Sequence, residues 1–224
     1  MCDFGRVKYF FAFLMVTLAS NTLGNIQLLD NGVKSSSLNW NVVNDTVMGG
    51  RSSSRWISNS PSISSFEGFL SLQNNGGFAS VRHDLKNIDL TNTEGIYLKV
   101  KGDGRKYQFR IRSQASRRAN YSHEFKTKKG KDQIFYLPYK DFKAAWRGRS
   151  LRDLPILNGK DVRGIGFFLG DKVQGEFKLE VSEIAAITQK EYSNMVKKDL
   201  INDSKSSVPN KQDKKFKLMT IDSY

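Results

Sequence analysis

The chain has 224 residues, of which 36 are Lys or Arg and 22 are Asp or Glu, so its formal net charge is +14. This length suits one globular domain with extensions, and the 15 Phe, 8 Tyr and 3 Trp residues favour a β-rich interior. A single cysteine, Cys2, and only two histidines argue against thiol chemistry and against a Cys/His metal cluster.

The first 24 residues have the layout of a secretory signal peptide. Arg6 and Lys8 form a short basic region, residues 9–18 are apolar, and residues 19–24 are small or polar. The apolar run is shorter than a membrane-spanning helix requires. We therefore expect entry into the secretory pathway, with cleavage near Gly24; an uncleaved anchor or import into an organelle is the alternative.

Residues 28–187 are predicted to form many short strands. Apolar and polar side chains alternate with a period of two, which is typical of half-buried strands. The alternating runs are 38–42, 66–72, 78–83, 96–100, 107–111, 121–125, 134–137, 165–169 and 177–181. Turn signals such as Asp103-Gly104 separate these runs, and only residues 139–146 suggest a short helix. The predicted fold is therefore all-β, an antiparallel sandwich or jelly roll.

Residues 188–224 differ in composition from this β-rich body. Residues 189–201 have the pattern of a short amphipathic helix. Residues 204–217 are rich in Lys, Ser, Asp and Asn and contain few apolar side chains. We expect a short helix followed by a basic, flexible tail.

The stretch from Asp45 to Ser52 ends a strand-like segment with two adjacent glycines. Glycines permit positive φ angles, so we predict a sharp turn, with positive φ at Gly50. A short carboxylate accepts hydrogen bonds from nearby backbone N–H groups, so Asp45 is a candidate cap for this turn. Asp45 and Arg51 either hold the turn together or contact a partner.

Two further groups of residues are candidate binding sites. Arg110 and Arg112 share one face of a predicted strand, which is either a polar sheet face that contacts a partner or a solvated surface. Trp146 and Arg147 lie in an aromatic and basic segment, where an arginine can stack on an aromatic ring or hold a carboxylate. In the predicted helix, Phe142 and Trp146 would instead pack one end of the sandwich.

The sequence contains no recognisable catalytic pattern. His83 and His123 lie on different predicted strands, and we find no Gly-rich phosphate loop and no Gly-x-Ser-x-Gly motif. No segment resembles a nucleic-acid-binding module, so a nucleic-acid partner is not expected. The basic residues are spread along the chain, which favours a solvated surface, with an anionic partner as the alternative. We therefore predict a binding protein without catalytic residues, metal or cofactor.

An ordered set of motifs resembles the complex I intermediate-associated protein 30 family. The motifs are WNVVNDTVMGGRS at 40–52, FEG at 66–68, NGGFASVR at 75–82, KGDGRKY at 101–107, LPY at 137–139, WRG at 146–148, IGFFL at 165–169 and GEFKLEV at 175–181. The resemblance covers residues 28–187. It implies a galactose-binding-like jelly roll with no known catalytic residues.

The resemblance also implies a function. The best-known members of the family are mitochondrial assembly factors for respiratory complex I, which act as chaperones for membrane-arm intermediates. It therefore implies a non-enzymatic assembly factor that binds a partner protein, and a mitochondrial location as the alternative to the secretory pathway. The second functional hypothesis is a secretory-pathway or extracellular binding module, for example for carbohydrate.

Overall fold

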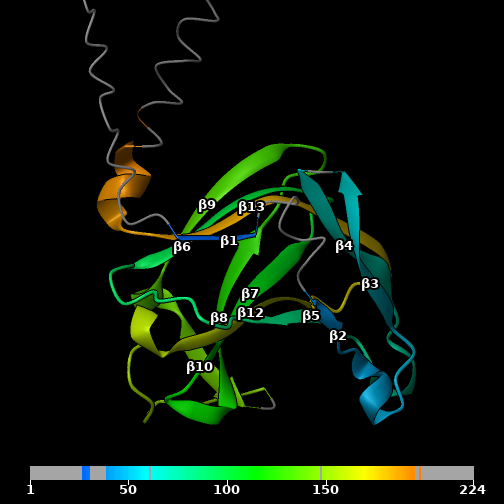
Figure 1. The fold of residues 1–224 in the computed structure, drawn as a ribbon. Helices are drawn as coiled ribbons and strands as arrows, with labels where there is room; N and C mark the ends of the chain where they lie inside the picture. Colours follow the sequence, from blue (N-terminus) through cyan, green and yellow to red (C-terminus); the bar gives the residue numbers. More distant parts are fainter. Residues whose placement is uncertain (1–26, 31–38, 61, 147, 195–196, 198–224) are drawn as a thin grey trace, which may run out of the picture.

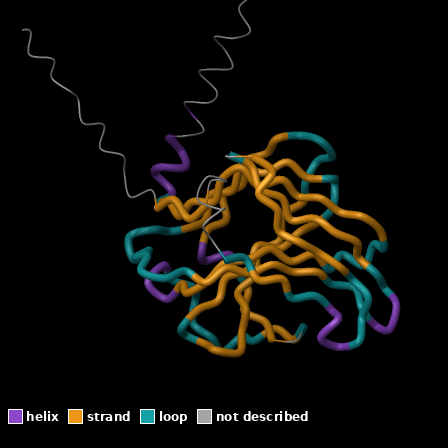
Figure 2. Tube along the Cα trace, turned by 45° about the vertical axis from the view of Figure 1, so that its right-hand side comes forward, coloured by secondary structure: helices purple, strands orange, loops and turns teal. Residues whose placement is uncertain are grey.

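The chain folds into two antiparallel β-sheets that pack against each other. The computed structural model of the chain describes residues 27–30, 39–60, 62–146, 148–194 and 197. Figures 1 and 2 show the strands arranged in two layers, with loops and short helical turns at the rim. The predicted all-β antiparallel sandwich is confirmed. The signal-like segment 1–24 and the tail 198–224 lie outside the described residues.

The first sheet contains six strands, in the order β3-β4-β13-β6-β9, with β1 also paired to β13. Its strands are β1 Gln27–Asp30, β3 Ser53–Ser60, β4 Ile63–Leu70, β6 Gly95–Gly102, β9 Asp132–Pro138 and β13 Gly175–Ile187. The long strand β13 pairs with β4 along its first half and with β1 along its second half. One strand thus holds this sheet together.

The second sheet contains seven strands, in the order β11-β10-β8-β7-β12-β5-β2. Its strands are β2 Asn41–Val42, β5 Ala79–Asp84, β7 Lys106–Ser113, β8 Ser116–Lys126, β10 Lys143–Trp146, β11 Arg149–Ser150 and β12 Val162–Leu169. Among the described residues, four 3-10 turns lie between strands: Asp45–Met48, Gln73–Asn75, Tyr139–Asp141 and Gly159–Asp161. The strands β8, β7 and β12 form the centre of this sheet, and β5 lies between β12 and the edge strand β2 (Figure 1).

The hydrophobic core lies between the two sheets. The largest fully buried side chains include Phe66, Leu70, Leu98, Tyr107, Phe109, Ile111, Tyr121 and Phe167. At one edge Trp40 stacks on Trp56 with 4.1 Å between the ring centroids, and both rings lie near Phe167. Burial of each such side chain stabilises the fold by roughly 1.5–3 kcal/mol relative to exposure. The period-two alternation therefore separates this core from the two outer faces.

The predicted short helix at residues 139–146 is wrong. The chain forms a 3-10 turn at Tyr139–Asp141 and then enters strand β10, Lys143–Trp146. Strand β10 pairs with β8, and this pairing replaces the helical hydrogen bonds. Phe142 is buried, whereas Trp146 is 39% exposed, so only Phe142 belongs to the core.

The predicted helix after the sandwich is present at residues 189–194 and 197. Thr188 and Glu191 form a reciprocal cap: the backbone N–H and hydroxyl of Thr188 donate to the Glu191 carboxylate, and the backbone N–H of Glu191 donates back to the Thr188 hydroxyl. Tyr192 stacks on Tyr136 of β9, with 4.7 Å between the ring centroids. These contacts hold the helix against the first sheet (Figure 1). Among the described residues, no helix is long and apolar enough to cross a membrane.

Candidate functional site

Asp45 is a buried structural residue at the junction of two turns. Its carboxylate accepts hydrogen bonds from the backbone N–H groups of Ser52, Gly77 and Phe78 at 2.9, 2.6 and 3.2 Å, and from the Ser52 hydroxyl at 2.6 Å. Burial alone would raise the pKa of Asp45, but these hydrogen bonds outweigh burial, and the pKa lies below its ordinary value. The side chain has 0% exposure, so it holds the turns together and does not face a partner.

The glycines beside Asp45 have two different roles. Gly49 adopts the left-handed conformation, with φ +88°, and makes the turn. The prediction of positive φ at Gly50 is wrong: Gly50 is required because a Cβ atom there would lie 2.4 Å from Cγ of Asp45. Gly76 is equally constrained, since its Cβ would lie 2.6 Å from Oδ2 of Asp45. Arg51 is exposed and has no hydrogen bond or ion pair within the described residues.

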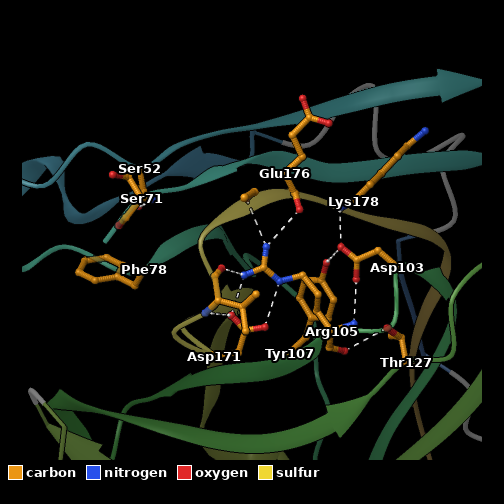
Figure 3. Close-up of polar contacts among 12 residues, drawn as sticks. Ser52, Ser71, Phe78, Asp103, Arg105, Tyr107, Thr127, Asp171, Glu176 and Lys178 are labelled. Atoms are coloured by element: carbon orange, nitrogen blue, oxygen red, sulfur yellow. Dashed lines mark hydrogen bonds and ion pairs between the residues drawn. The ribbon is translucent and has the colours of Figure 1, made fainter. Parts of the chain in front are cut away.

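A second buried polar cluster surrounds Arg105, in the predicted central hairpin (Figure 3). Its guanidinium donates to both carboxylate oxygens of Asp171, at 3.0 and 2.7 Å. It also donates to the backbone carbonyls of Gly175 at 3.4 Å, Glu176 at 3.1 Å and Val173. The side chains of Arg105 and Asp171 are only 10% and 9% exposed. Both ends of this ion pair are therefore satisfied inside the protein.

Asp103 extends the cluster to neighbouring strands. Its carboxylate accepts hydrogen bonds from the backbone N–H of Arg105 at 3.0 Å, from the hydroxyl of Tyr107 at 3.0 Å and from the backbone N–H of Lys178 at 2.9 Å. We call Asp103, Arg105 and Asp171 the Arg105 cluster. It ties the β6–β7 hairpin to the loop between β12 and β13. The motif KGDGRKY is thus a structural element.

On the outer face of the second sheet, arginines flank the two glycines of β12, Gly164 and Gly166. On β12, Gly166 pairs with Arg82 of β5 and with Arg110 of β7. Two residues earlier, Gly164 pairs with Asp84 and Arg112 on the same two strands. Side chains of paired residues point to the same face of a sheet. The glycines therefore form a floor between two arginine-bearing strands.

This face is hollowed. A cavity of about 630 Å³ is lined by Arg82, Asp84, Arg112, Ser113, Gln114, Ser116, Arg117, Arg118, Ala119, Asn120 and Arg163. A small hollow of about 10 Å³ above Gly166 adjoins it and is lined in part by Arg82, Arg110, Arg112 and Asn120. We call the surface formed by Arg82, Arg110, Arg112, Arg117, Arg118 and the two floor glycines the arginine groove. Asp84 is the one carboxylate in the described lining of these two cavities.

The three central guanidinium groups of the arginine groove are incompletely neutralised. Arg110 donates to the neutral amide oxygen of Gln108 at 3.0 and 2.8 Å, and its guanidinium carbon lies 3.3 Å from the centroid of the Phe168 ring. Arg82 has no hydrogen bond or ion pair within the described residues. Arg112 forms an ion pair with Asp84, but its buried Nε atom has no partner.

The surroundings of these arginines disfavour their positive charge. Burial and, to a smaller extent, the nearby charge of Arg82 together lower the pKa of Arg110 to about 10. Burial and the charge of Arg82 also hold the pKa of Arg112 below its ordinary value, and burial lowers the pKa of Arg82. All three remain protonated near neutral pH. A bound anion would relieve both their partial burial and their mutual repulsion.

Two of the predicted site residues lie side by side in the structure, and the other described ones lie elsewhere. Arg110 and Arg112 lie together, as their shared strand face predicted, and Arg82 joins them across β12. Sequence reasoning missed Arg82, although its period-two spacing from Ser80 marks it as outward-facing. Trp146 lies on β10, beside β11 at the edge of the second sheet, and Arg147 lies outside the described residues.

The described residues contain no arrangement typical of an enzyme or a metal site. His83 and His123 lie on different strands, and the Nδ1 atom of each contacts a backbone carbonyl, at 3.1 and 2.9 Å. Within the described part of the chain, no group of three or more His, Cys, Asp or Glu side chains is placed to hold a metal ion. The arginine groove is therefore the candidate functional site.

Comparisons with known proteins place the domain in a family and a fold. A family model described as complex I intermediate-associated protein 30 matches residues 30–181. No curated protein sequence matches the chain. Several of the solved structures that it resembles are carbohydrate-binding modules.

Two of these structures are family 11 modules from Clostridium thermocellum. The module of the cellulosomal cellulase Lic26A-Cel5E has a TM-score of 0.55 and 13% identity, over 73% of this chain and 96% of that chain. A family 11 module in complex with a β-1,3-1,4-mixed-linked tetrasaccharide has a TM-score of 0.52 and 16% identity, over 73% and 95%. At such identities the similarity demonstrates a common fold, which confirms the predicted jelly roll.

Proposed function

Because this chain belongs to the complex I intermediate-associated protein 30 family, we propose that it is a non-catalytic protein that binds a partner polypeptide during assembly of a respiratory membrane complex. The observation that carries this proposal is the arginine groove, where Arg82 and Arg110 face solvent without a carboxylate partner in the described residues. Charged groups that are half-buried and unpaired are costly, so such groups gather at functional sites.

The other polar surfaces of the sandwich support the same conclusion. On the outer face of the first sheet, Arg55 pairs with Glu67 at 2.8 Å and Lys178 pairs with Glu180 at 2.9 Å. That face is already neutralised within the chain. The arginine groove is therefore the better candidate for a partner-binding surface, and its open, polar lining differs from the apolar pockets typical of small-molecule sites.

The test is deletion of the gene, combined with affinity purification of the full chain carrying a C-terminal tag. We expect subunits of a membrane complex to co-purify with the tagged chain. We also expect the amount of assembled complex I to fall in the deletion strain and to recover when the gene is restored. An unchanged amount of complex I together with no captured membrane-complex subunit would refute the proposed function.

A second candidate function is that of a carbohydrate-binding module in the secretory pathway, and residues 1–24 favour it. Their basic, apolar and small-residue regions follow the order of a secretory signal peptide. This candidate predicts a mature N-terminus near Gly24, a luminal or secreted product and binding on a glycan array. Localisation of the tagged chain in mitochondria would contradict it and would support the first candidate.

A further inference from the structure

We propose that the arginine groove binds an extended acidic segment of the partner polypeptide, with carboxylates on alternate residues contacting Arg82, Arg110 and Arg112. The inference rests on the proposed function, since it identifies the part of the partner that this surface recognises. It depends on three features of the groove: the spacing of its arginines, its glycine floor and its unsatisfied guanidinium groups.

The spacing of the arginines matches an extended chain. Arg110 and Arg112 are two residues apart on β7, so their Cα atoms lie about 6.7 Å apart along the strand. Alternate side chains of an extended peptide point to the same side and have the same separation. Two acidic residues at positions i and i+2 of a bound segment therefore face Arg110 and Arg112 together.

The glycine floor keeps the outer face low at Gly166, whereas the Arg112 guanidinium lies over Gly164, where an added Cβ atom would be 2.5 Å from its Nη2 atom. Gly164 and Gly166 place no side chain on the outer face between β5 and β7. Arg82 stands on the far side of Gly166, about 9.5 Å from Arg110 across two strand spacings. A segment lying above β12 thus has an arginine on each side. The hollow above Gly166 is lined in part by Arg82, Arg110 and Arg112, but its volume of about 10 Å³ is water-sized, so a carboxylate contacts these arginines from its outer side.

The guanidinium groups have hydrogen-bonding capacity left for carboxylates. Arg82 has no partner in the described residues, and Arg110 donates only to the neutral Gln108. The planar guanidinium group matches a carboxylate in a bidentate geometry, and such charge-assisted pairs are stronger than neutral hydrogen bonds. The ion pair between Arg112 and Asp84 places one negative charge at the β5 edge of the groove. Because Asp84 faces Arg112 across Gly164, a carboxylate of the segment contacts Arg112 from the β7 side, and the residue of the segment that faces Asp84 on the β5 side is not acidic.

Other polyanions fit this surface less well. Single-stranded nucleic acids stack their bases on exposed aromatic rings. Here Phe78 and Phe168 stack on each other, with 5.5 Å between their centroids, and the Arg110 guanidinium covers Phe168. A uniformly sulfated polysaccharide would also meet Asp84 beside the groove and Glu124, which pairs with Lys106 at 3.0 Å. An interrupted pattern of carboxylates suits this mixed surface better than a continuous polyanion.

The experiment measures binding of labelled twelve-residue peptides to the full chain by fluorescence anisotropy at low and moderate salt. The probe peptide alternates Glu with Thr, one control peptide replaces every Glu with Gln, and a second control has the same composition with its Glu residues in one block. We expect the alternating peptide to bind most tightly, and higher salt to weaken its binding. Arg82→Gln and Arg110→Gln should each weaken binding about tenfold.

Arg55→Gln is the matched control, because it removes the same charge from the outer face of the first sheet, where Arg55 is paired with Glu67. It should leave the affinity unchanged. The proposal is overturned if the Gln peptide or the block peptide binds equally well, if heparin binds with higher affinity than the alternating peptide, or if Arg55→Gln weakens binding as much as Arg110→Gln.

The experiment also separates this inference from the proposed function. If the chain captures its membrane-complex partner but no acidic peptide binds the groove, the inference fails while the proposed function stands. If the alternating peptide binds with the expected pattern but gene deletion leaves complex I unchanged, the acidic recognition stands and the assembly role fails.

Discussion

The Arg105 cluster and the arginine groove both contain a partly buried arginine, but the two arginines differ in the hydrogen-bond and charge partners that the protein gives them. Arg105, which directly precedes β7, donates to both oxygens of Asp171 and to three backbone carbonyls. Arg110, within β7, donates only to a neutral amide and rests on an aromatic ring. The first guanidinium has its partners inside the protein, whereas the second does not.

This difference distinguishes a structural arginine from a binding arginine. Removal of one partner from a buried and saturated pair leaves an uncompensated charge and destabilises the fold. Removal of an arginine that lacks a carboxylate partner relieves repulsion and leaves no buried charge uncompensated. Sequence motifs do not distinguish a structural arginine from a binding arginine. The family-like motif KGDGRKY lies beside β7, and its arginine, Arg105, belongs to the structural cluster.

The largest expected effect is that of Arg105→Ala. This change leaves the buried carboxylate of Asp171 without its ion pair, and we expect the free energy of unfolding to fall by about 3–5 kcal/mol. Urea denaturation of the variant and of the wild type measures this change. The matched control is Arg55→Ala, whose side chain is 70% exposed, and we expect it to cost less than about 1 kcal/mol. Equal losses in the two variants would show that the Arg105 cluster has no special structural role.

Next in size is Gly50→Ala. Its new Cβ atom would displace the Asp45 carboxylate, whose Cγ lies 2.4 Å away, and we expect a loss of about 3 kcal/mol in unfolding free energy. Gly49→Ala should cost only about 1–2 kcal/mol, because it strains the backbone at φ +88° but meets no atom within 4 Å. Thermal unfolding of both variants ranks them. The reverse order would mean that backbone conformation, and not the space around Asp45, selects glycine here.

A smaller effect concerns pH. The pKa of Asp45 is lower in the folded chain than its ordinary value of 3.8, so the stability that this carboxylate contributes is complete above pH 3.8. That contribution is lost as pH falls through the lower, folded-state pKa. Asp45→Asn removes this titration, so its unfolding free energy should decline less steeply than that of the wild type between about pH 5 and pH 2. Parallel acid profiles would show that Asp45 does not contribute to acid unfolding.

The smallest expected effect on stability is that of the groove variants. Arg82→Gln and Arg110→Gln remove charges that lack a carboxylate partner in the described residues, so we expect Arg82→Gln to change the unfolding free energy by less than about 0.5 kcal/mol and Arg110→Gln, which also loses its contact with Phe168, to cost about 1 kcal/mol. Urea denaturation measures this as well. A loss as large as that of Arg105→Ala would place these arginines among the structural residues and remove the contrast between the two regions.

The fold was largely predictable from the sequence because alternation reports burial directly. The runs 96–100, 107–111, 165–169 and 177–181 correspond to parts of β6, β7, β12 and β13. The helix predicted at residues 139–146 failed because Phe142 and Trp146 have helical spacing, but pairing of β10 with β8 overrides that local preference.

The candidate site was only partly predictable. The shared strand face of Arg110 and Arg112 follows from their spacing, and the short carboxylate of Asp45 beside two glycines indicated a turn. The hydrogen bond from Gly77 to Asp45 spans 32 residues of sequence, and Arg82 meets Arg110 only because both strands pair with β12. Such neighbours are set by sheet topology, which periodicity does not specify.

Capture of the partner by an Arg82→Gln/Arg110→Gln double variant tests the central claim most directly. The tagged full-length variant is purified beside the wild type, and the captured membrane-complex subunits are quantified per folded molecule. If the arginine groove binds the partner, capture falls at least about tenfold while the unfolding free energy falls by no more than about 1–2 kcal/mol. Capture equal to that of the wild type would contradict the account.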